Sequence, residues 1–168
     1  MAASKALASL ALQKCRVIYA PHSFTPQGKS VFLAGTIDQG SSTWQESVVR
    51  SLSHLPVTIL NPHRPDWDST WMQDISCEPL REQITWELDM FEATDIIAMH
   101  VGRDSKAPIS LLELGLFAKS GKMIVACPEG FYRRGNVQVV CKRFGVELVN
   151  SLEELIQGIE KRLGEIKT

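Results

Sequence analysis

The sequence predicts an α/β protein in which a mostly parallel β-sheet is covered by helices on both faces. Short apolar runs rich in Val and Ile alternate along the chain with segments whose apolar residues recur at helical spacing. Strands that alternate with helices are typical of crossover units, whose parallel strands are buried on both sides. The 168 residues suit one domain, and 44% hydrophobic and 22% charged residues are ordinary values for a globular protein.

Five runs are expected to form the sheet, at residues 31–35, 57–61, 95–101, 123–128 and 146–149. Helices are expected between and after them, at residues 42–55, 79–93, 108–121, within 129–145, and from 151 onward. Residues 1–30 read as an N-terminal arm with one additional candidate strand at 16–20, and residues 31–168 as the domain. Five parallel strands with these connections favour a doubly wound, flavodoxin-like or Rossmann-like sheet, in which ligands bind beyond the carboxyl ends of the strands.

Composition and charge exclude several classes of function. The net charge of −1 argues against binding to nucleic acid or to an anionic membrane, and no apolar run approaches the roughly 18 residues of a spanning helix. The four cysteines and four histidines form no metal-binding pattern, and no phosphate-binding glycine motif is present, so we expect neither a metal nor a cofactor. Unpaired cysteines favour the reducing cytoplasm. The Ala-rich stretch 5–14 resembles a targeting segment only faintly, because it lacks a convincing cleavage site.

Glu113 is a lone carboxylate in the otherwise apolar stretch "PISLLELGLFAKSGK". A charge buried without partners costs several kcal/mol or changes its pKa, so Glu113 must have a partner or face a cavity that a ligand fills. Helical spacing places Ser110, a candidate substrate contact, on the same side as Glu113. The helix is apolar nearly all round, which indicates cover on more than one side and favours a homo-oligomer.

The preceding helix is expected to direct a second carboxylate inward. Ile84, Leu88 and Phe91 form its predicted core stripe, with Glu87 at the edge of that stripe and Gln83 one turn earlier. Two inward carboxylates near one crevice can divide their work between a nucleophile and a proton donor, which is how bonds to an anomeric carbon are commonly broken. Inward glutamates in inert ion pairs remain the alternative.

Five stretches, taken in order, resemble the nucleoside 2-deoxyribosyltransferase-like proteins and, more distantly, the deoxynucleoside 5'-monophosphate N-glycosidases. They are "VFLAGTIDQG", "NPHRPDW", "REQITWELDMFEATDII", "PISLLELGLFAKSGK" and "CPEGFYRRGNVQVVC". The resemblance covers about residues 31–155. Its most specific part is the stretch from Glu113 to Lys122, which begins with E-L-G and ends with G-K.

The resemblance implies a flavodoxin-like homo-oligomer that cleaves the N-glycosidic bond of a nucleoside or nucleotide. Glu113 would be the nucleophile, Glu87 would handle the base and its proton, and Gly35 and Thr36 would lie against the sugar. Asn136 would reach the site of a neighbouring subunit.

The chain departs from these relatives at two positions around the 5' end of the substrate. Asp38 stands where the N-glycosidases carry an arginine for the 5'-phosphate, and Ala107 replaces the Ser or Asp that holds the 5' group. An acidic residue at the first position would repel a phosphate. A nucleoside is therefore favoured over its 5'-monophosphate.

The remaining candidates each have a structural alternative. Trp67 could stack on a base and Arg64 could bind an anion, or the two could anchor Pro-rich turns through a Trp and an Arg–Asp pair. Gln83 could orient Glu87 or be an ordinary surface amide. For the whole protein, the alternatives to nucleoside chemistry are a Glu-based hydrolase of NAD or another N-glycoside and a non-catalytic module that senses a nucleotide or metabolite.

Overall fold

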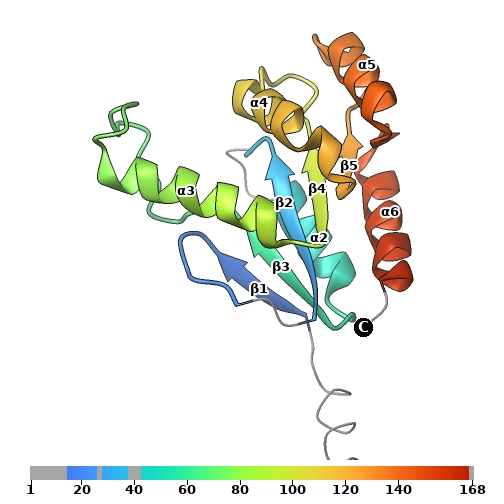
Figure 1. The fold of residues 1–168 in the computed structure, drawn as a ribbon, viewed down its shortest axis with the longest axis horizontal. Coiled ribbons are helices and arrows are strands. Elements are labelled where there is room, and N and C mark those ends of the chain that lie inside the picture. The colour runs from blue at the N-terminus through green and yellow to red at the C-terminus, as the bar shows by residue number, and fades with distance from the viewer. Residues whose placement is uncertain (1–14, 26–27, 38–42, 167–168) are drawn as a thin grey trace, which may run out of the picture.

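The computed structural model describes residues 15–25, 28–37 and 43–166. It contains six strands: β1 (Arg16–Tyr19), β2 (Lys29–Gly35), β3 (Val57–Asn61), β4 (Ile96–His100), β5 (Met123–Ala126) and β6 (Glu147–Val149). The described helices are α2 (Trp44–Leu52), α3 (Glu78–Ala93), α4 (Pro108–Phe117), which continues as the short 3-10 helix η1 (Ala118–Ser120), α5 (Arg134–Phe144) and α6 (Leu152–Glu165). Figure 1 shows these helices arranged around one sheet.

The sheet is parallel throughout, with the strand order β1-β3-β2-β4-β5-β6. The predicted count of five strands is wrong, because β1 pairs with β3 along its whole length, from Arg16 opposite Thr58 to Tyr19 opposite Asn61. Without β1, the other five strands follow the flavodoxin-like order. From β2 the chain first moves to β3 and later to β4 on the other side, so the carboxyl ends of β2 and β4 form the topological switch point.

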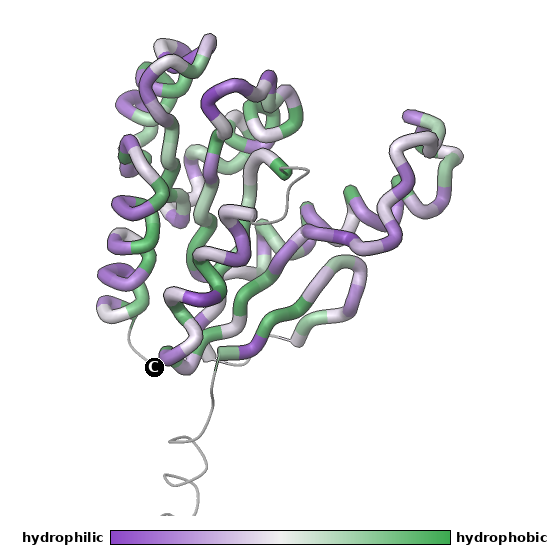
Figure 2. Tube along the Cα trace, turned by 180° about the vertical axis from the view of Figure 1, so that it is seen from behind, coloured by the Kyte–Doolittle hydropathy of each residue, from purple (hydrophilic) through white to green (hydrophobic). Residues whose placement is uncertain are grey.

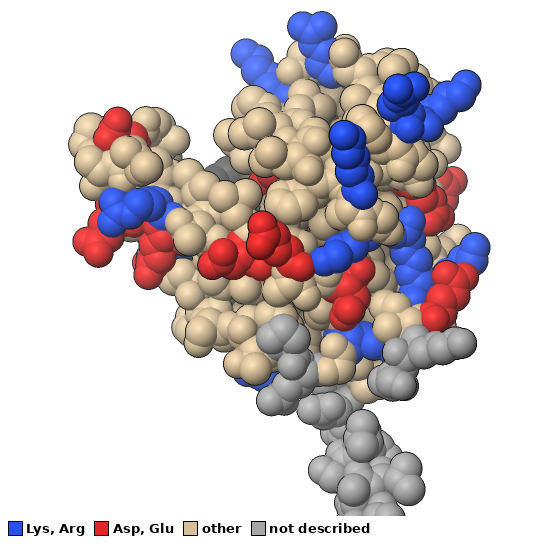
Figure 3. Space-filling model, in the orientation of Figure 1, with Lys and Arg blue, Asp and Glu red and all other residues tan. Residues whose placement is uncertain are grey.

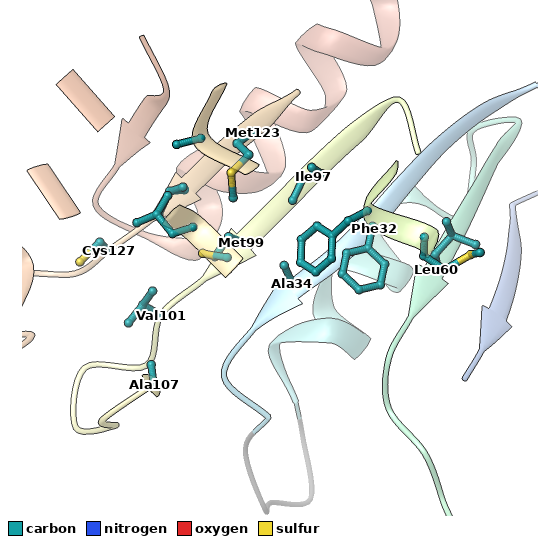
Figure 4. Close-up of a cluster of buried hydrophobic side chains, with 14 of the residues drawn as sticks. Phe32, Ala34, Leu60, Ile97, Met99, Val101, Ala107, Met123 and Cys127 are labelled. Atoms are coloured by element: carbon teal, nitrogen blue, oxygen red, sulfur yellow. The ribbon is translucent and has the colours of Figure 1, made fainter. Parts of the chain in front are cut away.

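Two hydrophobic cores form because neighbouring residues of each strand point to opposite faces of the sheet. In β2, Phe32 and Ala34 face α3, α4 and α5, whereas Val31 and Leu33 face α2 and α6. Figure 4 shows side chains of the first core, which come from several strands and converge on one face. In Figure 2 the apolar colour concentrates along the strands and on the inner sides of the helices. No described helix is long and apolar enough to cross a membrane.

Helix α3 packs on the sheet through a different stripe from the predicted one. Ile84 and Leu88 are 46% and 40% exposed, and the buried residues of the helix are Leu80, Gln83, Trp86, Met90 and Phe91. The aromatic rings decide the rotation of the helix, because Trp86 and Phe91 both pack on Phe32, at ring distances of 6.1 and 4.5 Å. The N-terminal part of α3 projects past the sheet (Figure 1), so this chain leaves its outer apolar side chains uncovered.

Candidate active site

Gly35 lets the ends of β2 and β4 approach closely at the switch point. It lies opposite His100 in the pairing of the two strands, with φ of 121°. A Cβ atom at this position would lie 2.1 Å from the carbonyl oxygen of His100, which is far inside van der Waals contact. Only glycine combines this φ with this approach. Position 35 therefore contributes only backbone atoms to the end of the sheet.

Thr36 ties the loop after β2 to the loop after β4. Its Oγ1 accepts a hydrogen bond from the backbone N–H of Gly102 at 3.0 Å and lies 3.1 Å from Oγ of Ser105. Because Ser105 donates its own proton to the carbonyl of Gly102 at 2.9 Å, Thr36 is the donor to Ser105. The hydroxyl proton of Thr36 is thus used to hold the crevice together. The Ser105 contact was not predicted from the sequence.

Helix α4 begins at this crevice after a strained residue. Ala107 has φ of 44° and ψ of 46°, a left-handed conformation that few non-glycine residues adopt, and Pro108 follows as the first helical residue. Ser110, one turn before Glu113, is 5% exposed, and its hydroxyl makes no hydrogen bond to any described residue. The hydroxyl is not among the fully enclosed polar atoms without a partner, so Ser110 remains accessible to a ligand.

Glu113 and Glu87 form a pair of half-buried carboxylates that interact with each other. Burial, together with the nearby charge of Glu87, raises the pKa of Glu113 to about 8. Burial also raises the pKa of Glu87, whereas a hydrogen bond from Gln83 acts in the opposite direction and lowers this pKa. Neither carboxylate is a member of an ion pair among the described residues. The lone charge of α4 therefore faces a second carboxylate and no cation.

Two such carboxylates titrate as a unit. When like charges share a site, the first proton is lost readily and the second is held, so over a range of pH the pair carries one proton. One carboxylate is then ionised while the other is an acid. This is the state that a reaction needing both a nucleophile and a proton donor requires.

Gln83 holds Glu87 in place from one turn earlier on α3. Its Nε2 donates to Oε1 of Glu87 at 2.8 Å and to the backbone carbonyl of Pro62 at 2.9 Å. Gln83 is 3% exposed, which excludes the alternative that it is an ordinary surface amide. Its Oε1 is buried and has no hydrogen-bond partner.

Arg64 is engaged in structural contacts at the start of α3. It forms ion pairs with Asp66 at 2.9 Å and Glu82 at 3.0 Å, and its guanidinium lies 5.2 Å from the ring centre of Trp71. The hydrogen bond that Arg64 donates to Asp66 is the main reason that the pKa of Arg64 is raised. Trp67, 43% exposed, packs edge-on against Trp71 at 5.0 Å. These contacts match the structural alternative for both residues, that of a loop anchored by Trp and an Arg–Asp pair.

Asn136 lies on α5, beside a cavity that this helix forms with α4. It lines a cavity of about 310 Å³ between α4 and α5, together with Leu111, Tyr132 and Arg133, and neither Glu113 nor Glu87 belongs to this lining. Asp38 lies outside the described residues. Lys and Arg side chains gather over α4 and α5, whereas Asp and Glu side chains occur along α3 (Figure 3).

Fold and site together define a class: a doubly wound α/β protein with two interacting carboxylates on the neighbouring helices α3 and α4. The chain belongs to the family described as nucleoside 2-deoxyribosyltransferase like, which it matches over residues 28–131. The family suggests an enzyme of N-glycosyl transfer that acts on nucleosides.

Comparison with solved structures supports the fold. A crystal structure of a conserved protein from Enterococcus faecalis V583 is similar with a TM-score of 0.54 and 12% sequence identity, over 81% of this chain and 99% of that chain. At this identity the likeness concerns the fold alone. No curated protein matches the chain significantly.

Proposed function

We propose that the protein cleaves the N-glycosidic bond of a nucleoside through a covalent intermediate on Glu113. The observation that carries this proposal is the pair Glu113–Glu87, two half-buried carboxylates on α4 and α3 that interact with each other and form no ion pair with a described residue. Inert buried glutamates are paired with Arg, Lys or backbone donors, and an arrangement of two unpaired carboxylates is unfavourable for folding. Its presence is explained by chemistry that needs both groups.

The proposed reaction has two steps. A carboxylate oxygen of Glu113 attacks the anomeric carbon, and the C–N bond to the base breaks. The electron pair of that bond goes to the base nitrogen. Glu87 gives its proton either to this nitrogen or to another atom of the base ring. The sugar is then an ester of Glu113. Water or a second base attacks the same carbon, gives its proton to Glu87, and releases Glu113 as a carboxylate. Water makes the reaction a hydrolysis, and a base makes it a transfer.

The shared proton explains how a group with a pKa of about 8 can act as nucleophile. In the empty site the proton resides mainly on Glu113, because Gln83 stabilises the ionised form of Glu87. A bound base offers a nitrogen or oxygen acceptor next to Glu87, which favours the proton on Glu87 and leaves Glu113 ionised. Substrate binding thus moves the proton to the carboxylate that needs it.

The remaining crevice residues are assigned to the sugar and the base. Gly35 allows the sugar to approach the backbone, Thr36 shapes the loop beside it, and Ser110 offers its hydroxyl to a sugar oxygen next to Glu113. The Arg64–Trp67 loop borders the base side. Asp38 disfavours a 5'-phosphate.

A homo-oligomer is part of the proposal. Ile109, Leu112 and Leu116 form one stripe on α4 at helical spacing and are 60%, 59% and 57% exposed. Exposed apolar patches of this kind mark interfaces. In this assembly Asn136 of one copy is assigned to the site of the neighbouring copy.

A substrate panel tests the proposal. The purified protein is incubated with ribo- and deoxynucleosides, their 5'-monophosphates and NAD, with and without a free acceptor base, and products are separated by chromatography. Release of free base from a nucleoside supports the proposal, and a new nucleoside formed with the acceptor identifies transfer. Cleavage of NAD alone assigns the site to a different N-glycoside, and binding without any turnover contradicts an enzymatic role.

A further inference from the structure

We propose that Gln83 is a positioning residue that fixes Glu87 so that only its Oε2 can carry the acid proton. The inference rests on the proposed function, because it concerns the proton that Glu87 supplies to the leaving base. Gln83 itself touches neither the reacting carbon nor the base in this account. It acts through the rotamer and protonation of Glu87.

The orientation of the Gln83 amide follows from its partners. The backbone carbonyl of Pro62 can only accept a hydrogen bond, and it lies 2.9 Å from the terminal atom assigned as nitrogen. That atom must therefore be Nε2, and the same nitrogen is 2.8 Å from Oε1 of Glu87. Both amide hydrogens are thereby directed at acceptors. An amide turned the other way would place two oxygens against each other at Pro62.

This orientation distinguishes the two oxygens of Glu87. Oε1 accepts a hydrogen from Gln83, and a proton placed there would point at, or compete with, an N–H group. The proton of the acid form is thus directed to Oε2. The only charged group with which Glu87 interacts among the described residues is Glu113 of α4. Glu113 is therefore the charged side chain with which Glu87 shares its proton.

Gln83 also ties Glu87 to the end of the sheet. Pro62 directly follows β3, so one side chain links the acid on α3 to the carboxyl edge where the crevice lies. The bridge leaves Oε1 of Gln83 buried and unpaired, an arrangement that opposes folding. An apolar side chain of similar size would fill this position without an unpaired acceptor. Its contribution to packing therefore does not account for the amide, whereas the position of Glu87 does.

The test is a pair of titrations by NMR of protein labelled with 13C at the glutamate carboxyl carbons, with signals assigned from Glu87→Gln and Glu113→Gln. Gln83→Met keeps the length of the side chain and removes both donors. We expect it to raise the titration midpoint of Glu87 by about half a pH unit or more, because a donor to the ionised form is lost. Gln45→Met is the control: Gln45 is 2% exposed and also has a buried, unpaired Oε1, but its amide nitrogen lies 3.5 Å from the carbonyl of Thr36. It should leave the Glu87 midpoint in place.

Activity gives the second readout. With a substrate that the wild type turns over, Gln83→Met should lower kcat by about tenfold or more with little change in KM, and should displace the alkaline limb of the pH profile upward. An unchanged Glu87 midpoint together with an unchanged pH profile would overturn the proposal. If Gln83→Met does not fold, Gln83→Asn, which is too short to span both acceptors, replaces it, and failure of both to fold would make Gln83 a purely structural bridge. Because the NMR midpoint needs no turnover, failure of this inference and failure of the proposed function are told apart.

Discussion

Replacing Glu113 by glutamine should abolish turnover and stabilise the protein in alkaline solution. The pKa of Glu113 rises from 4.5 to about 8 on folding, so the folded state holds a proton that the unfolded chain has already lost. A raised pKa contributes stability that is present below the unfolded value and is lost as the pH rises through the folded value. Wild-type stability should therefore fall between about pH 4.5 and pH 8 and then level off, relative to the variant.

The size of the effect follows from the shift. Each pKa unit corresponds to about 1.4 kcal/mol, so a change from 4.5 to about 8 sets a ceiling of about 5 kcal/mol. Glu113 is only half-buried and titrates together with Glu87. Solvent screening and this coupling therefore reduce the change in the free energy of unfolding below the ceiling. We expect about 2–3 kcal/mol in favour of Glu113→Gln at about pH 9, and little difference at about pH 4.

Urea unfolding of wild type and Glu113→Gln at both pH values measures this difference. Asp89→Asn, a change of an exposed carboxylate on the outer side of α3, is the matched control and should show no comparable gain at high pH. If the difference in free energy of unfolding between wild type and Glu113→Gln is the same at both pH values, the reasoning is refuted. A variant that loses its fold would make Glu113 a structural member of the core.

Glu87→Gln should lower the pKa of Glu113, because one of the two causes that raise this pKa is lost. It should also remove the alkaline limb that we expect near pH 8 in the kcat/KM profile. An unchanged limb would show that Glu87 and Glu113 do not titrate as a pair. Light scattering should give a mass above 18.7 kDa, and Leu112→Glu should reduce it to the monomer value, whereas a wild-type monomer at assay concentration would remove the proposed interface. Nucleosides should be better substrates than their 5'-monophosphates, and Asp38→Arg should narrow the gap; equal wild-type turnover of both would show that the charge argument chose the wrong contact. Gly35→Ala should prevent folding or lower stability by about 3 kcal/mol or more in thermal melts, because its Cβ would overlap the carbonyl of His100, and a melting temperature near that of the wild type would contradict the close approach.

Local pattern was enough to predict the layered α/β architecture and the two inward carboxylates. Alternating apolar runs placed β2 to β5 within a residue or two of their observed bounds, since buried parallel strands read as continuous apolar runs. Glu113 stood out because it is a charge in an apolar helix. Glu87 stood out because it lay at the edge of the predicted stripe of Ile84, Leu88 and Phe91, although only Phe91 of these three faces the core.

Features that depend on tertiary contacts could not be read from the sequence. The run at residues 16–20 was recognised as a candidate strand, but its place in the sheet depends on the free edge of β3, which a single segment does not reveal. The rotation of α3 is set by Trp86 and Phe91 packing on Phe32, so the equally apolar Ile84 and Leu88 were placed in the core wrongly.

The hydrogen bonds that shape the crevice were also out of reach of the sequence. The bonds of Thr36 with Gly102 and Ser105 cross about 66 to 69 residues of chain, and that of Gln83 with Pro62 crosses 21. No local pattern specifies such partners.

The central claim is that Glu113 becomes covalently attached to the sugar. It is tested most directly by mixing the protein with a nucleoside that it cleaves, quenching in acid within the first turnover, and measuring the masses of the intact protein and its peptides. The account predicts a sugar adduct on the peptide that contains Glu113, absent from Glu113→Gln, which releases no base. An adduct on a different peptide, or base release by Glu113→Gln at the wild-type rate, would contradict it.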